Sequence, residues 1–116
     1  MENDKKNIVL EKSFQLALRI VKLTTELSKV NRILADQILR SGTSVGANLN
    51  EAQAALTKKE FIAKVAIAAK EIRETKYWLM LLTESNLMKK DIELEILVDD
   101  IIKIVTKIIK TSQENN

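Results

Sequence analysis

The sequence predicts an all-α fold, an antiparallel four-helix bundle with up-down-up-down topology. The chain of 116 residues has no proline and two glycines, and 46% of its residues are hydrophobic while only 3% are aromatic. This composition favours helices over sheets, and the aliphatic residues recur at helical spacing in four segments. We expect a single domain over residues 8–111, with residues 1–7 and 112–116 as frayed termini.

The first helix is expected from about Ile8 to Lys29. A short connection at Val30 and Asn31 follows it, because asparagine can end one helix and cap the next. Two helices joined so tightly should run antiparallel. The residues of the first helix that we expect to face the core are Leu10, Phe14, Ala17, Leu18, Val21 and Leu27.

The second helix is expected from about Arg32 to Ala55, and it contains both glycines of the chain, Gly42 and Gly46. Each glycine inside a helix costs about 0.8–1 kcal/mol relative to alanine. The neighbouring residues are also small, so close approach of another helix explains the glycines. The alternative is a break in the helix at this point.

The third helix begins after a capping box, Thr57-Lys58-Lys59-Glu60, in which the hydroxyl and the carboxylate bind amides that have no partner in the helix. We expect this helix from Lys58 to Ser85. It is apolar on nearly every side in places, which indicates burial by more than one neighbour. A turn at Asn86 follows.

The fourth helix is expected from about Lys89 to Lys110. Its apolar positions cover an arc of about 160°, wider than the ~100° stripe that faces a single core. The excess predicts a second contact surface, which in a small protein indicates a homo-oligomer. The candidate oligomer interface consists of Ile102, Val105, Ile109 and Trp78.

A strip of polar residues borders the apolar face of the second helix. It contains Gln37, Arg40, Ser41, Ser44, Asn48 and Glu51. The third helix offers the partners Lys64, Glu71, Glu74 and Tyr77. We expect Arg40 to bind Glu71 or Glu74, because a guanidinium can form two charge-assisted hydrogen bonds with carboxylates. We interpret this set as a structural polar network that fixes helix register or subunit contact; a ligand site is the alternative.

Residue usage argues against an enzyme. The chain has no cysteine and no histidine, so it lacks thiolate chemistry, the usual general base and the commonest transition-metal ligand. The carboxylates Glu51, Glu71 and Glu74 could suggest a di-metal site in a bundle, but such sites use a Glu-x-x-His pair. We therefore expect no catalytic residue, no metal and no cofactor.

The charge permits an anionic partner. The formal net charge is +3 and the isoelectric point about 9.2. The candidate nucleic-acid face lies on the first helix and just beyond it, and contains Lys12, Arg19, Lys22, Lys29 and Arg32. Repetition of this face in an oligomer would multiply phosphate contacts with RNA or DNA. A solvated outer face is the alternative interpretation.

The polar first residues and the short apolar runs indicate where in the cell the protein is located. The first residues are polar and lack the apolar segment of a signal peptide. No apolar run approaches the roughly 20 residues that span a bilayer. We expect a cytoplasmic protein with no membrane partner.

Two segments of the chain resemble a known family. The first runs from Gln37 to Glu51, with Gln37-Ile38-Leu39-Arg40-Ser41 and Ala47-Asn48-Leu49-Asn50-Glu51. The second contains Glu60-Phe61-Ile62, Ala68-Ala69-Lys70-Glu71 and Glu74-Thr75-Lys76-Tyr77-Trp78-Leu79. Together they resemble the bacterial four-helix-bundle proteins encoded in intervening sequences of 23S rRNA genes, some of which are labelled ribosomal proteins. Ala52 and Gly42 depart from the pattern, but both remain small.

This resemblance implies an up-down-up-down bundle, a homo-oligomeric ring of five subunits and no established enzymatic activity. A related group comprises the accessory protein of diversity-generating retroelements, which makes nucleic-acid binding an expectation by analogy. We expect a self-assembling accessory module that binds structured RNA or DNA through backbone electrostatics. A protein-binding scaffold without a nucleic-acid role is the alternative.

Overall fold

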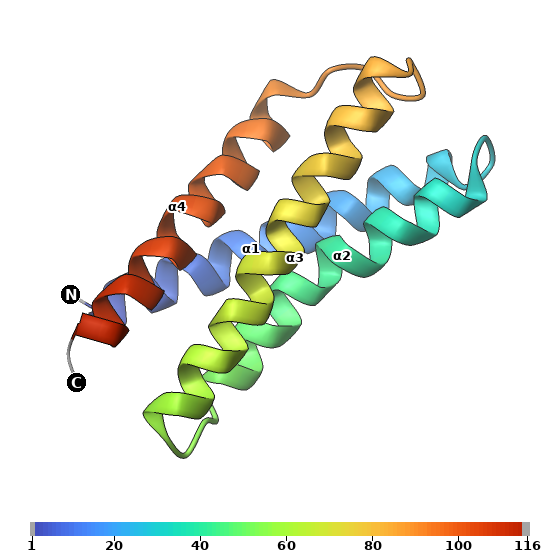
Figure 1. Cartoon of the computed structure of the whole chain (residues 1–116). Helices are drawn as coiled ribbons and strands as arrows, with labels where there is room; N and C mark the ends of the chain where they lie inside the picture. The colour runs from blue at the N-terminus through green and yellow to red at the C-terminus, as the bar shows by residue number, and fades with distance from the viewer. Residues whose placement is uncertain (1, 115–116) are drawn as a thin grey trace.

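The computed structural model describes residues 2–114, with side chains from residue 8 onward. It contains four helices, labelled in Figure 1: α1 (Glu2–Leu27), α2 (Arg32–Ala52), α3 (Lys58–Glu84) and α4 (Ile92–Glu114). Expectations for residues 1, 115 and 116 lie outside the described part. Helix α1 begins earlier than predicted, α2 ends earlier, and α4 continues past Lys110.

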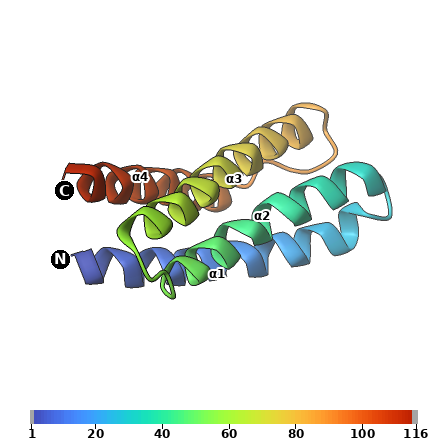
Figure 2. The same ribbon diagram turned by 60° about the horizontal axis from the view of Figure 1, so that its bottom comes forward.

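The helices form the predicted all-α bundle. Each helix packs against its neighbours in sequence, and α4 closes against α1. Figure 2 shows α1 and α2 in one layer and α3 and α4 in the other. The molecule is elongated, with principal extents of 47 × 23 × 18 Å. No helix of residues 2–114 is long and apolar enough to cross a bilayer.

Capping side chains explain where three helices begin. The Asn31 side chain accepts a hydrogen bond from the Leu34 amide at 3.0 Å and starts α2. Thr57 accepts one from the Glu60 amide at 3.1 Å, and the Glu60 carboxylate accepts one from the Leu56 amide at 3.2 Å, so both side chains of the predicted capping box bind amides at the start of α3. Asp91 starts α4 in the same way, by accepting from the Leu94 amide.

Both glycines lie within an unbroken α2, because α1 passes close to them. A Cβ atom on Gly42 would lie 2.8 Å from Cγ1 of Ile20. A Cβ atom on Gly46 would lie 3.3 Å from Oγ of Ser13 and 3.5 Å from its carbonyl oxygen. The prediction of close approach by another helix is therefore confirmed, and the alternative of a helix break is wrong.

The predicted core face of α1 is wrong for three residues. Phe14, Leu18 and Val21 are 64%, 49% and 48% exposed. We call these three residues the α1 stripe. The core instead contains Val9, Leu16 and Ile20, together with Ser13 and Thr24.

The error has a physical cause. Hydroxyl residues look like surface positions in a hydrophobic pattern, but Ser13 and Thr24 are buried with their hydroxyls bonded to the carbonyl oxygens of Leu10 and Val21, at 3.0 and 3.1 Å. A buried hydroxyl costs little once it is hydrogen-bonded. Ser13 also suits the position because Gly46 packs against it.

The wide apolar arc of α4 is used mostly within the subunit. Val105 is fully buried, so the prediction that it lies at an oligomer interface is wrong. Ile102, Ile109 and Trp78 are partly buried and pack against the margins of the core. The bundle places α4 between α1 and α3, and two neighbours cover a wider arc than one.

Candidate functional site

A buried hydroxyl pair links the middles of α2 and α3. Ser41 and Thr75 are completely buried, and Thr75 Oγ1 lies 2.9 Å from Ser41 Oγ. The Ser41 hydroxyl also contacts the carbonyl oxygen of Ile38 at 3.4 Å. This pair occupies an apolar interface between helices, where an unpaired hydroxyl would be costly. It therefore favours one axial alignment of α2 on α3.

Arg40 lies beside this pair and bridges α2 to two carboxylates of α3. Its guanidinium donates to Glu71 Oε1 at 3.1 Å and to Glu74 Oε2. Glu74 Oε2 also accepts from the indole nitrogen of Trp78 at 3.0 Å. The Trp78 ring meets Tyr77 edge-on, with centroids 5.2 Å apart. One guanidinium thus binds two carboxylates one turn apart on α3, and one of them, Glu74, holds the indole of Trp78.

The electrostatics follow from these contacts. The indole hydrogen bond from Trp78 and the Arg40 guanidinium lower the pKa of Glu74 below its ordinary value, despite the opposing effect of partial burial. Glu74 and Glu71 raise the pKa of Arg40. Arg40 and Glu74 are therefore both charged at neutral pH.

A second ion pair lies nearer the α2–α3 connection. Lys64 of α3 donates to Glu51 of α2 at 2.7 Å, and this hydrogen bond raises the pKa of Lys64. The remaining polar residues of the predicted strip do not reach across. Ser44 donates to the Arg40 carbonyl oxygen at 2.6 Å, and Asn48 donates to the Ser44 carbonyl oxygen at 2.8 Å. Gln37 is exposed.

The arrangement is suited to joining helices. In the part of the chain with described side chains, no buried polar side-chain atom lacks a hydrogen-bond partner. The same residues contain no cluster of acidic side chains with the geometry of a metal site. Arg40 is already paired with two carboxylates within the subunit. The geometry thus gives a structural role to Arg40, Ser41, Glu51, Glu71 and Glu74, and the partner that sequence reasoning left out is Thr75. A hydroxyl within an apolar helix face was the available signal.

The predicted nucleic-acid face is divided by the fold. Lys12 binds Asp100 at 3.3 Å and Arg19 binds Asp91 at 2.6 Å, so both cations face α4. Lys29 pairs with Glu26 of its own helix at 3.3 Å. Lys22 and Arg32 are exposed and form no ion pair within the described side chains. The two cations of the predicted face that project outward without an ion pair among the described residues, Lys22 and Arg32, therefore lie toward the α1–α2 connection.

The bundle and its α2–α3 network define a small helical protein whose central polar residues join helices. Residues 5–110 match the family described as 23S rRNA-intervening sequence protein, and the chain belongs to this family. A solved structure of a protein with unknown function from the S23 ribosomal protein family of Bacteroides thetaiotaomicron VPI-5482 is 40% identical and has a TM-score of 0.86. The match covers 91% of this chain and 98% of that one. No protein of curated function matches the chain.

Proposed function

We propose that the chain is a non-enzymatic, self-assembling accessory module of the cytoplasm that binds structured RNA or DNA through phosphate contacts. Assembly is the part that the geometry supports best, and the single observation that carries it is the α1 stripe. Three large apolar side chains at i, i+4 and i+7 spacing are about half exposed or more on one face. Apolar surface of this kind marks interaction sites. By family resemblance the assembly is a ring of five subunits.

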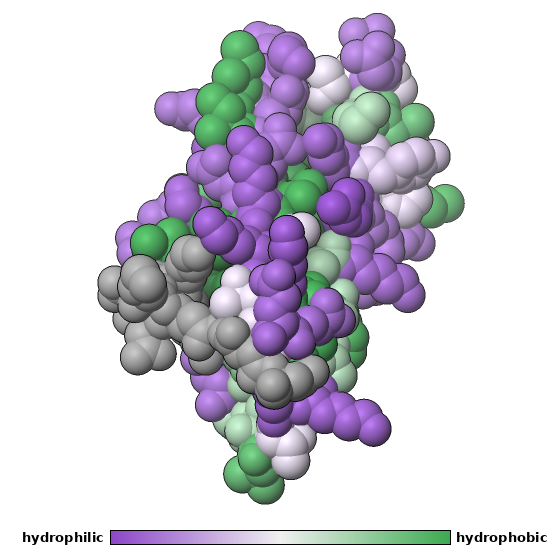
Figure 3. Space-filling view, turned by 60° about the vertical axis from the view of Figure 1, so that its left-hand side comes forward, coloured by the Kyte–Doolittle hydropathy of each residue, from purple (hydrophilic) through white to green (hydrophobic). Residues whose placement is uncertain are grey.

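The surface of the bundle is mixed in hydropathy (Figure 3). Figure 3 shows apolar residues at the surface in separate patches among hydrophilic ones. The stripe is followed directly by Lys22, and Lys29 and Arg32 lie at the next connection. Assembly would repeat these exposed cations once per subunit, so weak phosphate contacts would add up. This repetition supports nucleic-acid binding by a chain with a formal net charge of only +3.

A protein-binding scaffold is the second candidate. It is favoured by the pairing of Lys12 with Asp100 of α4 and of Arg19 with Asp91 just before α4, because those cations lose most of their value for a phosphate. The two candidates differ in their salt dependence. Phosphate binding weakens steeply as salt rises, whereas apolar docking does not.

Light scattering tests both parts of the proposal. The protein alone should have a mass several times that of the 13.2 kDa chain, with about five times expected for the ring. A structured RNA hairpin should add mass at about 50 mM salt and much less at about 200 mM. A monomer would refute self-assembly, and an assembled protein that ignores RNA at both salt concentrations would favour the scaffold.

Variants locate the phosphate contacts. Arg32→Gln should weaken RNA binding and make its salt dependence shallower, because fewer counterions are displaced. Lys12→Gln serves as the matched control, because Lys12 is already paired with Asp100. Equal losses from both changes would contradict the assignment of the outward cations.

A further inference from the structure

We infer that the α1 stripe of one copy binds a groove between α3 and α4 of a second copy, in a head-to-tail contact that repeats from subunit to subunit. This inference rests on the proposed self-assembly and names the two surfaces that perform it. The groove, called here the α3–α4 groove, lies between the second half of α3 and the start of α4, and its cavity has a volume of about 280 Å³.

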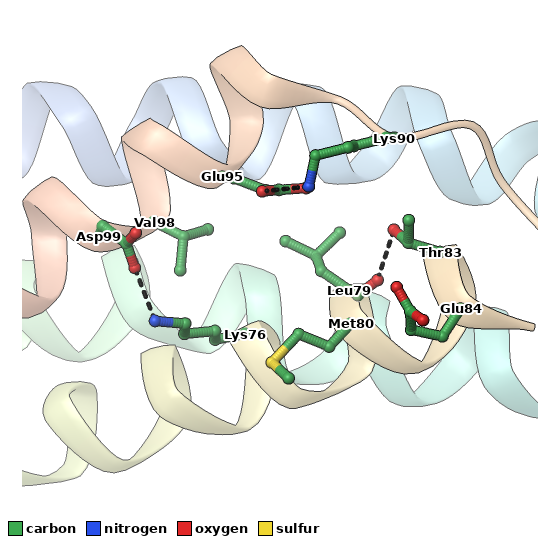
Figure 4. A pocket seen from close by; sticks show the side chains of 9 residues that line it. All are labelled: Lys76, Leu79, Met80, Thr83, Glu84, Lys90, Glu95, Val98 and Asp99. Atoms are coloured by element: carbon green, nitrogen blue, oxygen red, sulfur yellow. Dashed lines mark hydrogen bonds and ion pairs between the residues drawn. The ribbon is translucent and has the colours of Figure 1, made fainter.

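The α3–α4 groove has an apolar floor and a charged rim. Figure 4 shows Leu79 and Val98 between two ion pairs, with Met80 beside Lys76 at the edge of the groove. One rim pair joins Lys76 to Asp99 at 2.9 Å, and the other joins Lys90 to Glu95 at 3.1 Å. Met80 is 58% exposed although it lines the cavity. An apolar cavity of ~150 Å³ holds a benzene ring, so this groove has room for the phenyl ring of Phe14.

The α1 stripe and the groove lie at the same height along the bundle. Lys12 of α1 and Lys76 of α3 pair with consecutive residues of α4, Asp100 and Asp99. Because α1 and α3 run in the same direction, the stripe is level with the segment of α3 that lines the groove. At 1.5 Å per residue the stripe is about 10 Å long, and the groove from Lys76 to Glu84 is about 12 Å long. The lengths match.

The two surfaces point in different directions. Phe14 and Val21 follow Lys12 and Arg19 by two residues, which is about 200° around the helix. Since Lys12 and Arg19 face α4, the stripe faces away from α4. A subunit therefore cannot fill its own groove with its own stripe. The contact joins unlike surfaces, which is the heterologous type that forms rings or open stacks.

The charges select one orientation. Lys22 and Glu84 are exposed, and neither forms an ion pair within the described side chains. With the two bundles parallel and at the same height, Lys22 of one copy lies near Glu84 of the other, and Glu11 lies near Lys76. With one bundle reversed, Lys22 would lie near Lys76 and Glu11 near Glu84. Opposite charges thus meet only in the parallel arrangement, and like charges oppose the reversed one.

Two single-surface variants test the contact. Leu18→Glu places a charge in the stripe, and Met80→Glu places one in the groove. Each should weaken self-association at least about tenfold. Both positions are exposed, so the variants should fold, which circular dichroism verifies. Ala63→Glu on α3 is the matched control, because it adds the same charge at an exposed position outside both surfaces.

Mixing the two variants gives the decisive result. Leu18→Glu keeps an intact groove and Met80→Glu keeps an intact stripe, so an equimolar mixture should form a dimer of about twice 13.2 kDa that does not grow. No recovery on mixing, or normal assembly of Met80→Glu, would overturn the inference and indicate that the stripe packs elsewhere. A monomeric wild-type protein would instead refute the proposed self-assembly itself.

Discussion

Because α1 approaches Gly42 closely, we predict that Gly42→Ala lowers the stability of the protein, which is the opposite of what helix propensity alone predicts. Replacing glycine by alanine inside a helix should gain about 1 kcal/mol. At Gly42, however, the added methyl group would lie 2.8 Å from Cγ1 and 3.0 Å from Cγ2 of Ile20, which is completely buried. Overpacking of this kind costs about 1–3 kcal/mol. We therefore expect Gly42→Ala to destabilise the protein by about 1 kcal/mol net.

A double-mutant cycle isolates the cause. Ile20→Ala removes both clashing atoms and by itself costs about 2–5 kcal/mol. In that background Gly42→Ala should stabilise the protein by up to about 1 kcal/mol, because the propensity gain is then opposed only by the Cβ atom of residue 20, at 3.3 Å. The coupling between the two positions should therefore be about 1–3 kcal/mol.

Urea denaturation followed by circular dichroism measures these differences, and a change of about 1 kcal/mol corresponds to a shift in Tm of about 4 °C. Gly46→Ala is the matched control, because its nearest neighbour is the hydroxyl oxygen of Ser13 at 3.3 Å. We expect that change to be close to neutral or slightly stabilising. The reasoning is refuted if Gly42→Ala stabilises the wild-type protein, or has the same effect with and without Ile20.

Three further predictions concern the α2–α3 network. Thr75→Val should lower the free energy of unfolding by about 1 kcal/mol, because Ser41 loses its main partner; adding Ser41→Ala should recover part of the loss in urea titrations. The lowered pKa of Glu74 predicts stability that is present above its unfolded value of about 4.3 and is lost as pH falls through the folded pKa. Glu74→Gln should flatten that acid limb in thermal melts, and an unchanged limb would argue against the pairing. Arg40→Ala should cost about 1 kcal/mol and shift the fluorescence of Trp78, the only tryptophan, whereas a fully stable variant would contradict its joining role.

The α2–α3 network shows which features of the structure residue spacing can predict. The helical period placed Arg40, Ser41 and Glu51 at the border of the apolar face, and the structure pairs each of them with α3. The same period placed Ser44 and Asn48 there, yet both bind backbone oxygens of their own helix. Spacing predicts which side a residue occupies. It does not predict whether its side chain is long enough, or aimed well enough, to cross to the next helix.

The apolar residues of α1 and α4 show the same limit of prediction from residue spacing. The excess of apolar residues predicted a second contact surface on α4, but the structure buries Val105 there and exposes Phe14, Leu18 and Val21 on α1. The sequence alone showed that the chain has more apolar residues than one core can bury. Their position depended on how far α1 rotates about its own axis. That rotation is set by Ser13 and Ile20 packing against the glycines of α2.

By itself the sequence determined the four helices, most of their ends, their order around the bundle and the family. These features depend on interactions within a few residues, such as caps at Asn31 and Thr57, and on connections too short for any topology but antiparallel neighbours. Only the tertiary structure decided which face of α1 is buried, which cations remain free of carboxylates, and where a groove opens between α3 and α4. Those features depend on distances of 3–4 Å between atoms far apart in the chain, and no local pattern encodes such distances.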